Sequence, residues 1–212
     1  MRRIARYKFL LAASAAWVCL WLSPLRGILE SDMALHMMVQ LPLLIAIGFM
    51  LATVLGPHEP RWFVNADWLG IPSLLLVIFT TSIWMLPRML DLALGNIWID
   101  LLKFASLPLL AGLPLGLSWP RVPALGRAFL WANLISMLAT MGGLYLGAPQ
   151  RLCAYYRLDQ QTTAGTTLIA IAVVLGLSWF IVLFIGAPSF PERHRKIRVR
   201  RAHGGSPAFP RN

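Results

Sequence analysis

Residues 163–185 have the sequence TAGTTLIAIAVVLGLSWFIVLFI, which contains no Asp, Glu, Lys or Arg. A transmembrane α-helix needs roughly 20 consecutive apolar residues. Five further runs of similar length precede this one, without the alternation of apolar and polar residues that a membrane β-barrel requires. They are Phe9–Leu25, His36–Leu55, Leu69–Leu86, Ile97–Trp119 and Leu125–Leu146. The sequence therefore predicts an all-α fold, a polytopic transmembrane bundle of about six helices.

The overall composition agrees with a membrane protein. Of the 212 residues, 58% are apolar and 13% are charged, whereas a soluble domain carries about 25% charged residues. The net charge of +11 comes from Lys and Arg at the two ends and in the short gaps between apolar runs. This placement is typical of membrane orientation and not of a nucleic-acid surface. We expect one bundle domain over residues 1–187 and a basic, disordered cytoplasmic tail over 188–212.

The distribution of basic residues predicts the orientation. With both termini in the cytoplasm, fourteen of the 19 Lys and Arg residues lie on the inner side, and only Arg26, Arg88, Arg151 and Arg157 lie on the outer side. The positive-inside rule therefore favours an N-in, C-in, multi-pass protein of the bacterial inner membrane. The first apolar run is alternatively a signal peptide with small residues at 13–15, but cleavage there would leave a short apolar core. We expect the helix to be retained.

Polar residues with ligand chemistry gather on the predicted outer side. Asp32 and His36 are one helical turn apart, as are Met33 and Met37. Thioether, thiol and imidazole groups together suit Cu(I). The candidate copper ligands are His36, Met33, Met37, Asp32, Met85 and Cys153. Other interpretations remain open: methionines that fill gaps in the core, a hydrogen-bonded histidine, and a disulfide between Cys19 and Cys153.

Further polar residues are expected to contribute to the same side. Asp100 and Lys103 are three positions apart on one helix, so we predict an ion pair facing the bundle interior. Asp159 is a natural N-cap for the last helix, and Gln160 follows it. We expect Asp159, Asp32 and Asp91 to lie near one another, because they sit at helix ends on the same side. Clustered carboxylates need a counter-charge, and the candidates are Arg88, Arg151, Arg157 and Lys103.

Three stretches resemble the CtaG-like family of cytochrome c oxidase assembly factors of the caa3 type. Residues 32–48 resemble the family's His-Met-x-x-His helix and the Pro-Leu-Leu stretch that follows it. Residues 84–91 are similar to a Trp-His-Leu-Pro segment followed by Asp. Residues 159–165 resemble the signature Asp-Gln-Gln-x-x-Gly. The resemblance implies an inner-membrane assembly factor with haem–copper oxidase subunits as partners and with Cu(I) received or delivered at the periplasmic face.

The chain departs from the family pattern at its histidines. Asp32 and Met85 stand where the family has His, and the fourth helix offers Lys103 in place of another. A protonated lysine has no lone pair for a metal. The alternative is therefore a metal-free membrane scaffold that binds subunits of a membrane complex, and a weaker one is a transporter. No nucleophile arrangement or phosphate-binding glycine loop is found, so we do not expect an enzyme.

Overall fold

The computed structural model describes residues 2–55 and 61–185, and every secondary-structure element in this part of the chain is helical. Five helical stretches are long and apolar enough to cross a membrane: Met33–Leu55, Trp68–Met85, Ile97–Ser118, Ala124–Gly147 and Leu158–Ile185. A bent pair near the start of the chain raises the number to six if it forms one span. The all-α bundle of about six transmembrane helices is therefore confirmed. The predicted tail at 188–212 lies outside the described residues.

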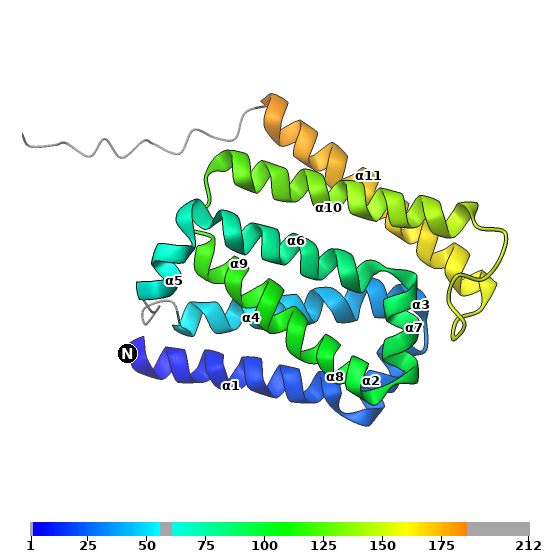
Figure 1. The fold of residues 1–212 in the computed structure, drawn as a ribbon, viewed down its shortest axis with the longest axis horizontal. Helices are drawn as coiled ribbons and strands as arrows, with labels where there is room; N and C mark the ends of the chain where they lie inside the picture. Colours follow the sequence, from blue (N-terminus) through cyan, green and yellow to red (C-terminus); the bar gives the residue numbers. More distant parts are fainter. Residues whose placement is uncertain (1, 56–60, 186–212) are drawn as a thin grey trace, which may run out of the picture.

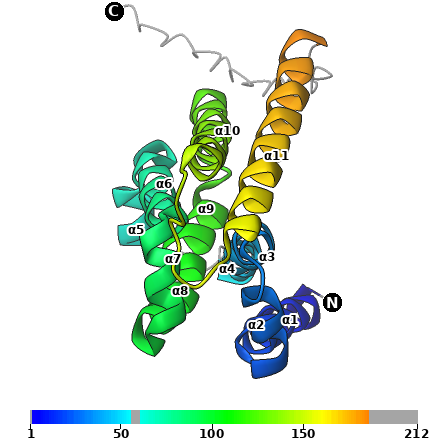
Figure 2. The same cartoon turned by 90° about the vertical axis from the view of Figure 1, so that its right-hand side faces the viewer.

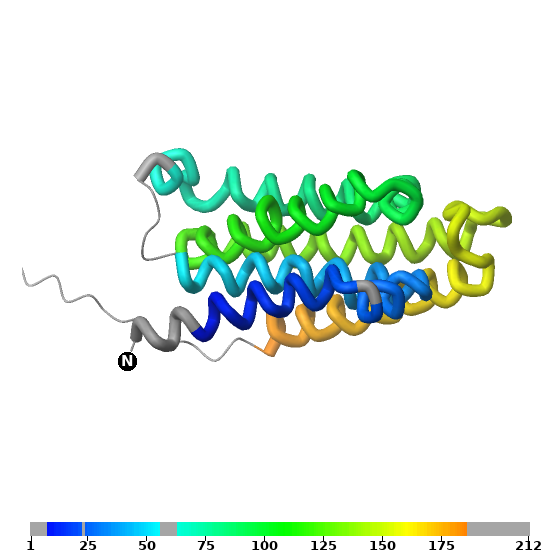
Figure 3. Tube along the Cα trace, turned by 90° about the horizontal axis from the view of Figure 1, so that it is seen from below, coloured from blue at the N-terminus to red at the C-terminus, as the bar shows by residue number. Residues whose placement is uncertain are grey.

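The long helices run roughly along one common axis (Figures 1 and 3). In chain order the elements are α1 (Arg2–Trp21), α2 (Ser23–Glu30), α3 (Met33–Leu35), η1 (His36–Gln40), α4 (Leu41–Leu55), α5 (Arg61–Ala66), η3 (Trp68–Gly70), α6 (Ile71–Met85), α7 (Pro87–Gly95), α8 (Ile97–Ser106), η4 (Leu107–Gly112), α9 (Leu113–Ser118), α10 (Ala124–Gly147) and α11 (Leu158–Ile185). Figure 2 shows α4 between the α1–α2 pair and the α10–α11 pair. Helices α2, α3 and α7 and residues 148–157 share one end of the bundle, which we call the polar end (Figure 1).

The first predicted segment differs from the structure at its end. It was expected to continue to Leu25, but the chain bends by 67° between Lys8–Trp21 and Pro24–Glu30. Pro24 stands in the first turn of α2, where its missing N–H costs no helical hydrogen bond. An amphipathic helix of this kind suits a membrane–water interface. The bend therefore directs Arg26 and Glu30 across the polar end of the bundle.

Two π-helical turns interrupt the transmembrane helices, and each precedes a proline. The backbone N–H of Leu41 bonds to the carbonyl of His36, directly before Pro42. The N–H of Leu113 likewise bonds to the carbonyl of Pro108, directly before Pro114. A proline inside a helix removes a backbone donor, and a local π turn is one way to re-pair the remaining groups. The first π turn carries His36 and Gln40, both fully buried.

Close backbone packing holds α4 against η4. A Cβ atom at Gly48 would overlap the backbone of Pro108, and one at Gly112 would overlap the carbonyl of Ile45. A second such contact joins α10 and α11, where a Cβ at Gly142 would lie 2.8 Å from the carbonyl oxygen of Gly165. Small residues at helix crossings are typical of membrane bundles, because they allow the backbones to approach. These contacts position the helices that carry the polar residues.

A buried carboxylate organises the end of the bundle opposite the polar end. Asp67 is 2% exposed, and it accepts hydrogen bonds from the Ser118 hydroxyl, from Nη2 of Arg121 at 3.0 Å and from the backbone N–H of Ser73 at 3.1 Å. Burial alone would raise the pKa of Asp67, but the hydrogen bonds from Ser118, Ser73 and Arg121 outweigh it and lower the pKa. This cluster ties the start of α6 to the end of α9.

The lowered pKa of Asp67 predicts a loss of stability in acid. A carboxylate whose folded pKa lies below its ordinary value of 3.8 stabilises the fold above that pH, and the contribution disappears as the pH falls through the folded pKa. We expect the midpoint of thermal unfolding to fall below pH 3.8 in the wild type and to fall less in Asp67→Asn, measured in detergent. Equal acid sensitivity of the two proteins would contradict this assignment.

Candidate functional site

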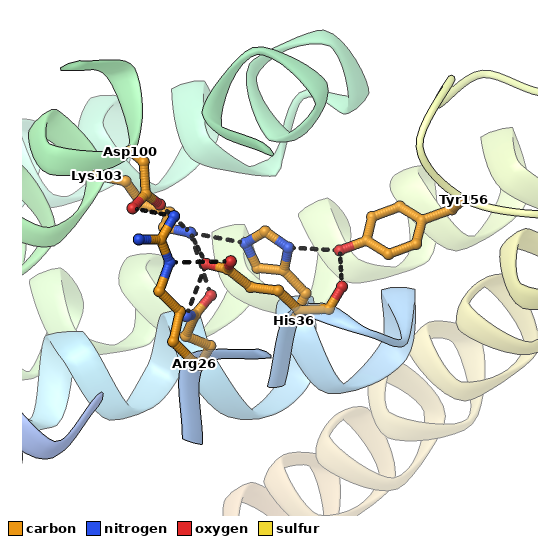
Figure 4. Close-up of polar contacts among 7 residues, drawn as sticks. Arg26, His36, Asp100, Lys103 and Tyr156 are labelled. Carbon is orange, nitrogen blue, oxygen red and sulfur yellow. Dashed lines mark hydrogen bonds and ion pairs between the residues drawn. The ribbon is translucent and has the colours of Figure 1, made fainter. Parts of the chain in front are cut away.

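A fully buried lysine stands at the centre of a charged network at the polar end (Figure 4). The Nζ atom of Lys103 lies 2.9 Å from Oδ1 of Asp100 and 3.0 Å from Oε1 of Glu30. The predicted ion pair between Asp100 and Lys103 is therefore confirmed, and both side chains are 0% exposed. An ionised side chain inside a membrane bundle is costly unless it is paired, and here the pairing extends to a second helix.

Arg26 bridges the two carboxylates of the network. Nη2 of Arg26 lies 2.8 Å from Oδ2 of Asp100, and Nε of Arg26 lies 3.1 Å from Oε2 of Glu30. Arg26, Glu30, Lys103 and Asp100 thus form a ring in which each carboxylate contacts both cations, and we call it the charged ring. Its formal charges sum to zero. Two local spacings build it, the i,i+4 pair on α2 and the i,i+3 pair on α8.

A hydrogen-bonded chain leads from the charged ring to the surface loop. Nζ of Lys103 lies 3.1 Å from Nε2 of His36, and Nδ1 of His36 lies 2.7 Å from the hydroxyl of Tyr156. An ammonium group only donates, so Nε2 of His36 accepts and Nδ1 carries the hydrogen. The hydroxyl of Tyr156 in turn donates to the backbone carbonyl of Glu30 at 3.1 Å. Burial, followed by the charge of Glu30, raises the pKa of Tyr156 and keeps this donor protonated.

Gln40 completes the site. Its Oε1 accepts from Nζ of Lys103 at 3.2 Å, and its Nε2 donates to Oε1 of Glu30 at 3.1 Å. Gln40 follows His36 by four positions in the π turn, so both side chains reach the same cation. The network therefore joins α2, η1, α8 and the loop before α11. Asp100 takes part in it through its ion pairs with Arg26 and Lys103, and neither of its oxygens has a hydrogen bond in the described chain.

The first predicted copper ligands are committed to other contacts. The lone pair of His36 that could bind a metal is taken by the Lys103 ammonium, which would also repel a cation. Oδ1 of Asp32 accepts from the backbone N–H groups of Ala34 and Leu35, so Asp32 is the N-cap of α3. Met33 and Met37 are both 0% exposed and belong to the hydrophobic core.

Met85 and Cys153, the remaining predicted copper ligands, also make other contacts. Met85 is 7% exposed and packs in the same core. Cys19 and Cys153 are free cysteines, and Sγ of Cys153 donates to the carbonyl of Pro87 at 3.6 Å. Burial and then the charge of Asp91 raise the pKa of Cys153 to about 12, whereas a metal takes the thiolate. Within residues 2–55 and 61–185, no group of three His, Cys, Asp or Glu residues could hold a metal ion. The donor atoms of His36, Asp32 and Cys153 are thus engaged in other contacts.

The predicted aspartates bind different segments. Asp91 accepts from the backbone N–H groups of Ala154 and Tyr155, at 2.7 and 3.4 Å. Asp159 is exposed and pairs with Nε of Arg157 at 3.0 Å, which confirms the expected cation beside at least one aspartate. The predicted N-cap role of Asp159 is wrong, because α11 begins at Leu158 and Asp159 stands inside its first turn. The charges of Asp32 and Asp91 both act on the Tyr156 hydroxyl, so these two lie near the same side chain. They serve as separate anchors of the polar end.

Two glutamines fasten the loop that carries Tyr156. Nε2 of Gln160 donates to the carbonyl of Ser31 at 3.1 Å, which links the start of α11 to the chain between α2 and α3. Gln161 is 2% exposed, accepts from the backbone N–H of Leu152 and donates to the carbonyl of Tyr145. The Asp-Gln-Gln stretch therefore has a clear structural role at the polar end.

Sequence reasoning did not identify every member of the network. Arg26 and Glu30 share an i,i+4 spacing, and Gln40 follows His36 by four positions, so local signals for these three were present. Tyr156 lies in a loop 120 positions from His36, and no local pattern marks it.

Comparisons with known proteins find no match: no family model fits this chain, and no curated protein or solved structure is similar to it.

Proposed function

We propose that this chain is a membrane scaffold that assists the assembly of a haem–copper oxidase and does so without binding copper itself. The metal-free form of the proposal rests on one observation, the Lys103 ammonium 3.1 Å from Nε2 of His36. The oxidase partner rests on the resemblance of three stretches to CtaG-like assembly factors. These stretches begin at Asp32, Trp84 and Asp159.

The polar end offers a pre-formed surface to a partner. Side chains bond to backbone groups of other segments, as in the contacts from Gln160 to Ser31 and from Ala154 to Asp91. Ile28 on α2, Trp98 in the first turn of α8 and Tyr155 in the loop before α11 are 60–75% exposed. Exposed aromatic and aliphatic side chains on a rigid surface favour protein association, because little conformational entropy is lost on binding. We propose that a subunit of the oxidase docks here.

The test combines a metal titration with a genetic deletion. The purified full-length protein is titrated with Cu(I) against a chromogenic chelator, with His36→Ala as the matched variant. We expect no stoichiometric binding at micromolar Cu(I) in either protein. We also expect deletion of the gene to lower oxidase activity, and added copper to leave the defect unchanged. One Cu(I) per protein, lost in His36→Ala, would replace this proposal with copper delivery.

A scaffold for a different membrane complex is distinguished by the same deletion strain. In that case oxidase activity stays normal, and subunits of the other complex co-purify with the tagged protein. A transporter would leave both measurements unchanged, and either result contradicts the oxidase proposal.

The proposed site requires the polar end to face the periplasm of a bacterial inner membrane. The excess of Lys and Arg on the opposite side is the basis for this orientation. We expect a reporter that is active only in the periplasm to work when fused at Arg151 and to fail when fused after Arg201. The reverse pattern, read against a cytoplasmic reporter at the same two positions, would overturn the orientation.

A further inference from the structure

An open pocket adjoins the charged ring on the side of α1 and α2. It measures about 420 Å³ and is lined by Trp21, Arg26, Gly27, Glu30 and Ile97. Arg26 uses Nε and Nη2 in its ion pairs, and its other terminal nitrogen has no hydrogen bond in the described chain (Figure 4). The Arg26 side chain is 24% exposed. The pocket thus offers an unused N–H donor of a guanidinium beside a carboxylate.

A second, apolar pocket lies farther along the same helix. It measures about 300 Å³ and is lined mainly by Ala13, Ser14 and Trp17 of α1, Ile47 and Leu51 of α4 and Phe104 of α8. This volume is at the lower end of the roughly 300–1,000 Å³ typical of ligand pockets. From Trp21 in the first pocket to Ala13 in the second, α1 rises about 12 Å. That distance is most of one leaflet of a hydrocarbon core that is about 30 Å thick.

Among the described residues, one side-chain hydrogen bond joins α1 to α8 beside these pockets, and we call this junction together with the two pockets the seam. Nε1 of Trp17 donates to the carbonyl of Phe104 at 2.9 Å. This carbonyl lies four residues before Pro108, which has no N–H to offer it. The indole therefore donates to a carbonyl that cannot accept from the residue four positions later, and it ties α1 to α8 beside the apolar pocket. The seam is charged in the pocket beside the charged ring and apolar in the pocket farther along α1.

We propose that this seam binds one phosphatidylethanolamine molecule, with its phosphate on Arg26, its ammonium beside Glu30 and an acyl chain in the apolar pocket. The argument for this occupant is charge complementarity. The charged ring is neutral as a whole and shows one cation and one anion to the pocket, so it matches a zwitterionic head group better than an anionic one. A choline head group has no N–H to donate to a carboxylate, which favours ethanolamine.

Native mass spectrometry of the full-length protein in detergent tests the proposal. Palmitoyl-oleoyl lipids with ethanolamine, choline and glycerol head groups are titrated separately, and glycerophosphoethanolamine serves as a probe without acyl chains. We expect one phosphatidylethanolamine to bind about tenfold tighter than either other lipid, the ratio for roughly one charge-assisted hydrogen bond. The soluble probe should not bind. Equal affinity for the three lipids, or binding of the soluble probe, would overturn the proposal.

Two substitutions block the seam without removing a charge. A Cβ at Gly27 meets nothing within 4 Å, so Gly27→Leu should fold and fill the pocket beside the charged ring. Ser14 is exposed and lines the apolar pocket, which Ser14→Phe should fill. We expect each to weaken phosphatidylethanolamine binding about tenfold. The matched controls are Gly143→Leu, also in open space, and Val173→Phe on α11, which is 52% exposed. Loss of binding in the controls, or unchanged binding in both blocking variants, would refute the site.

Discussion

Lys103→Met is expected to cost more stability than any other single substitution in the charged ring. It leaves the carboxylates of Asp100 and Glu30 with one cation between them, in a place where Asp100 is 0% exposed. Removing one partner of a buried ion pair costs about 3–5 kcal/mol, because the remaining charge stays buried without compensation. Thermal or denaturant-induced unfolding of the purified protein in detergent measures the loss. Methionine keeps the unbranched apolar stem of the side chain, and the substitution removes the charge together with the Nζ donor to His36 and Gln40.

Two controls separate the charge effect from a general loss of packing. Arg157→Met removes an exposed cation, whose side chain is 78% exposed, and should change stability by less than about 0.5 kcal/mol. The double variant Lys103→Met with Asp100→Asn removes one charge of each sign and leaves the Arg26–Glu30 pair. We expect it to be more stable than Lys103→Met alone. A double variant that is less stable than the single one would show that the charges are not coupled.

Gly48→Ala is expected to produce the largest loss among substitutions of the helix packing. The added Cβ would overlap the carbonyl of Pro108, which is backbone and cannot move away without shifting η4. Overpacking typically costs about 1–3 kcal/mol, and the rigid neighbour places this case at the upper end. Gly143→Ala is the matched control, because a Cβ there meets nothing within 4 Å. We expect a lower unfolding midpoint for Gly48→Ala only.

Gly48→Ala should also weaken the contacts of the charged ring. Gly48 lies on the helix that follows His36 and Gln40, and Pro108 follows Lys103 by five residues on the partner helix. Separation of the two helices would lengthen the contact between Lys103 and His36, which is 3.1 Å in the native protein. Combined with Lys103→Met, Gly48→Ala should therefore cost less than the sum of the two separate losses. Strict additivity would show that the packing and the network are independent.

Length and apolar composition were sufficient to predict the bundle. A run such as residues 163–185 has few alternatives to a membrane helix, because backbone groups in lipid must bond within their own segment. The segment boundaries mostly agreed within a few residues, as with Ile97, which begins α8 in both the prediction and the structure. The bend after Trp21 was missed, although Pro24 was a local signal for a new helix start.

The sequence by itself determined which residues share a helix face, and only the tertiary structure decided what faces them. The ion pair between Asp100 and Lys103 could be predicted, since three positions on a helix bring two side chains together. The bond between Lys103 and His36 spans 67 positions, and it exists because close helix packing and a π turn bring the two elements together. Local periodicity carries no information on how helices rotate and approach one another. For that reason His36 had the pattern of a metal ligand in the sequence and is a hydrogen-bond acceptor of an ammonium group in the fold.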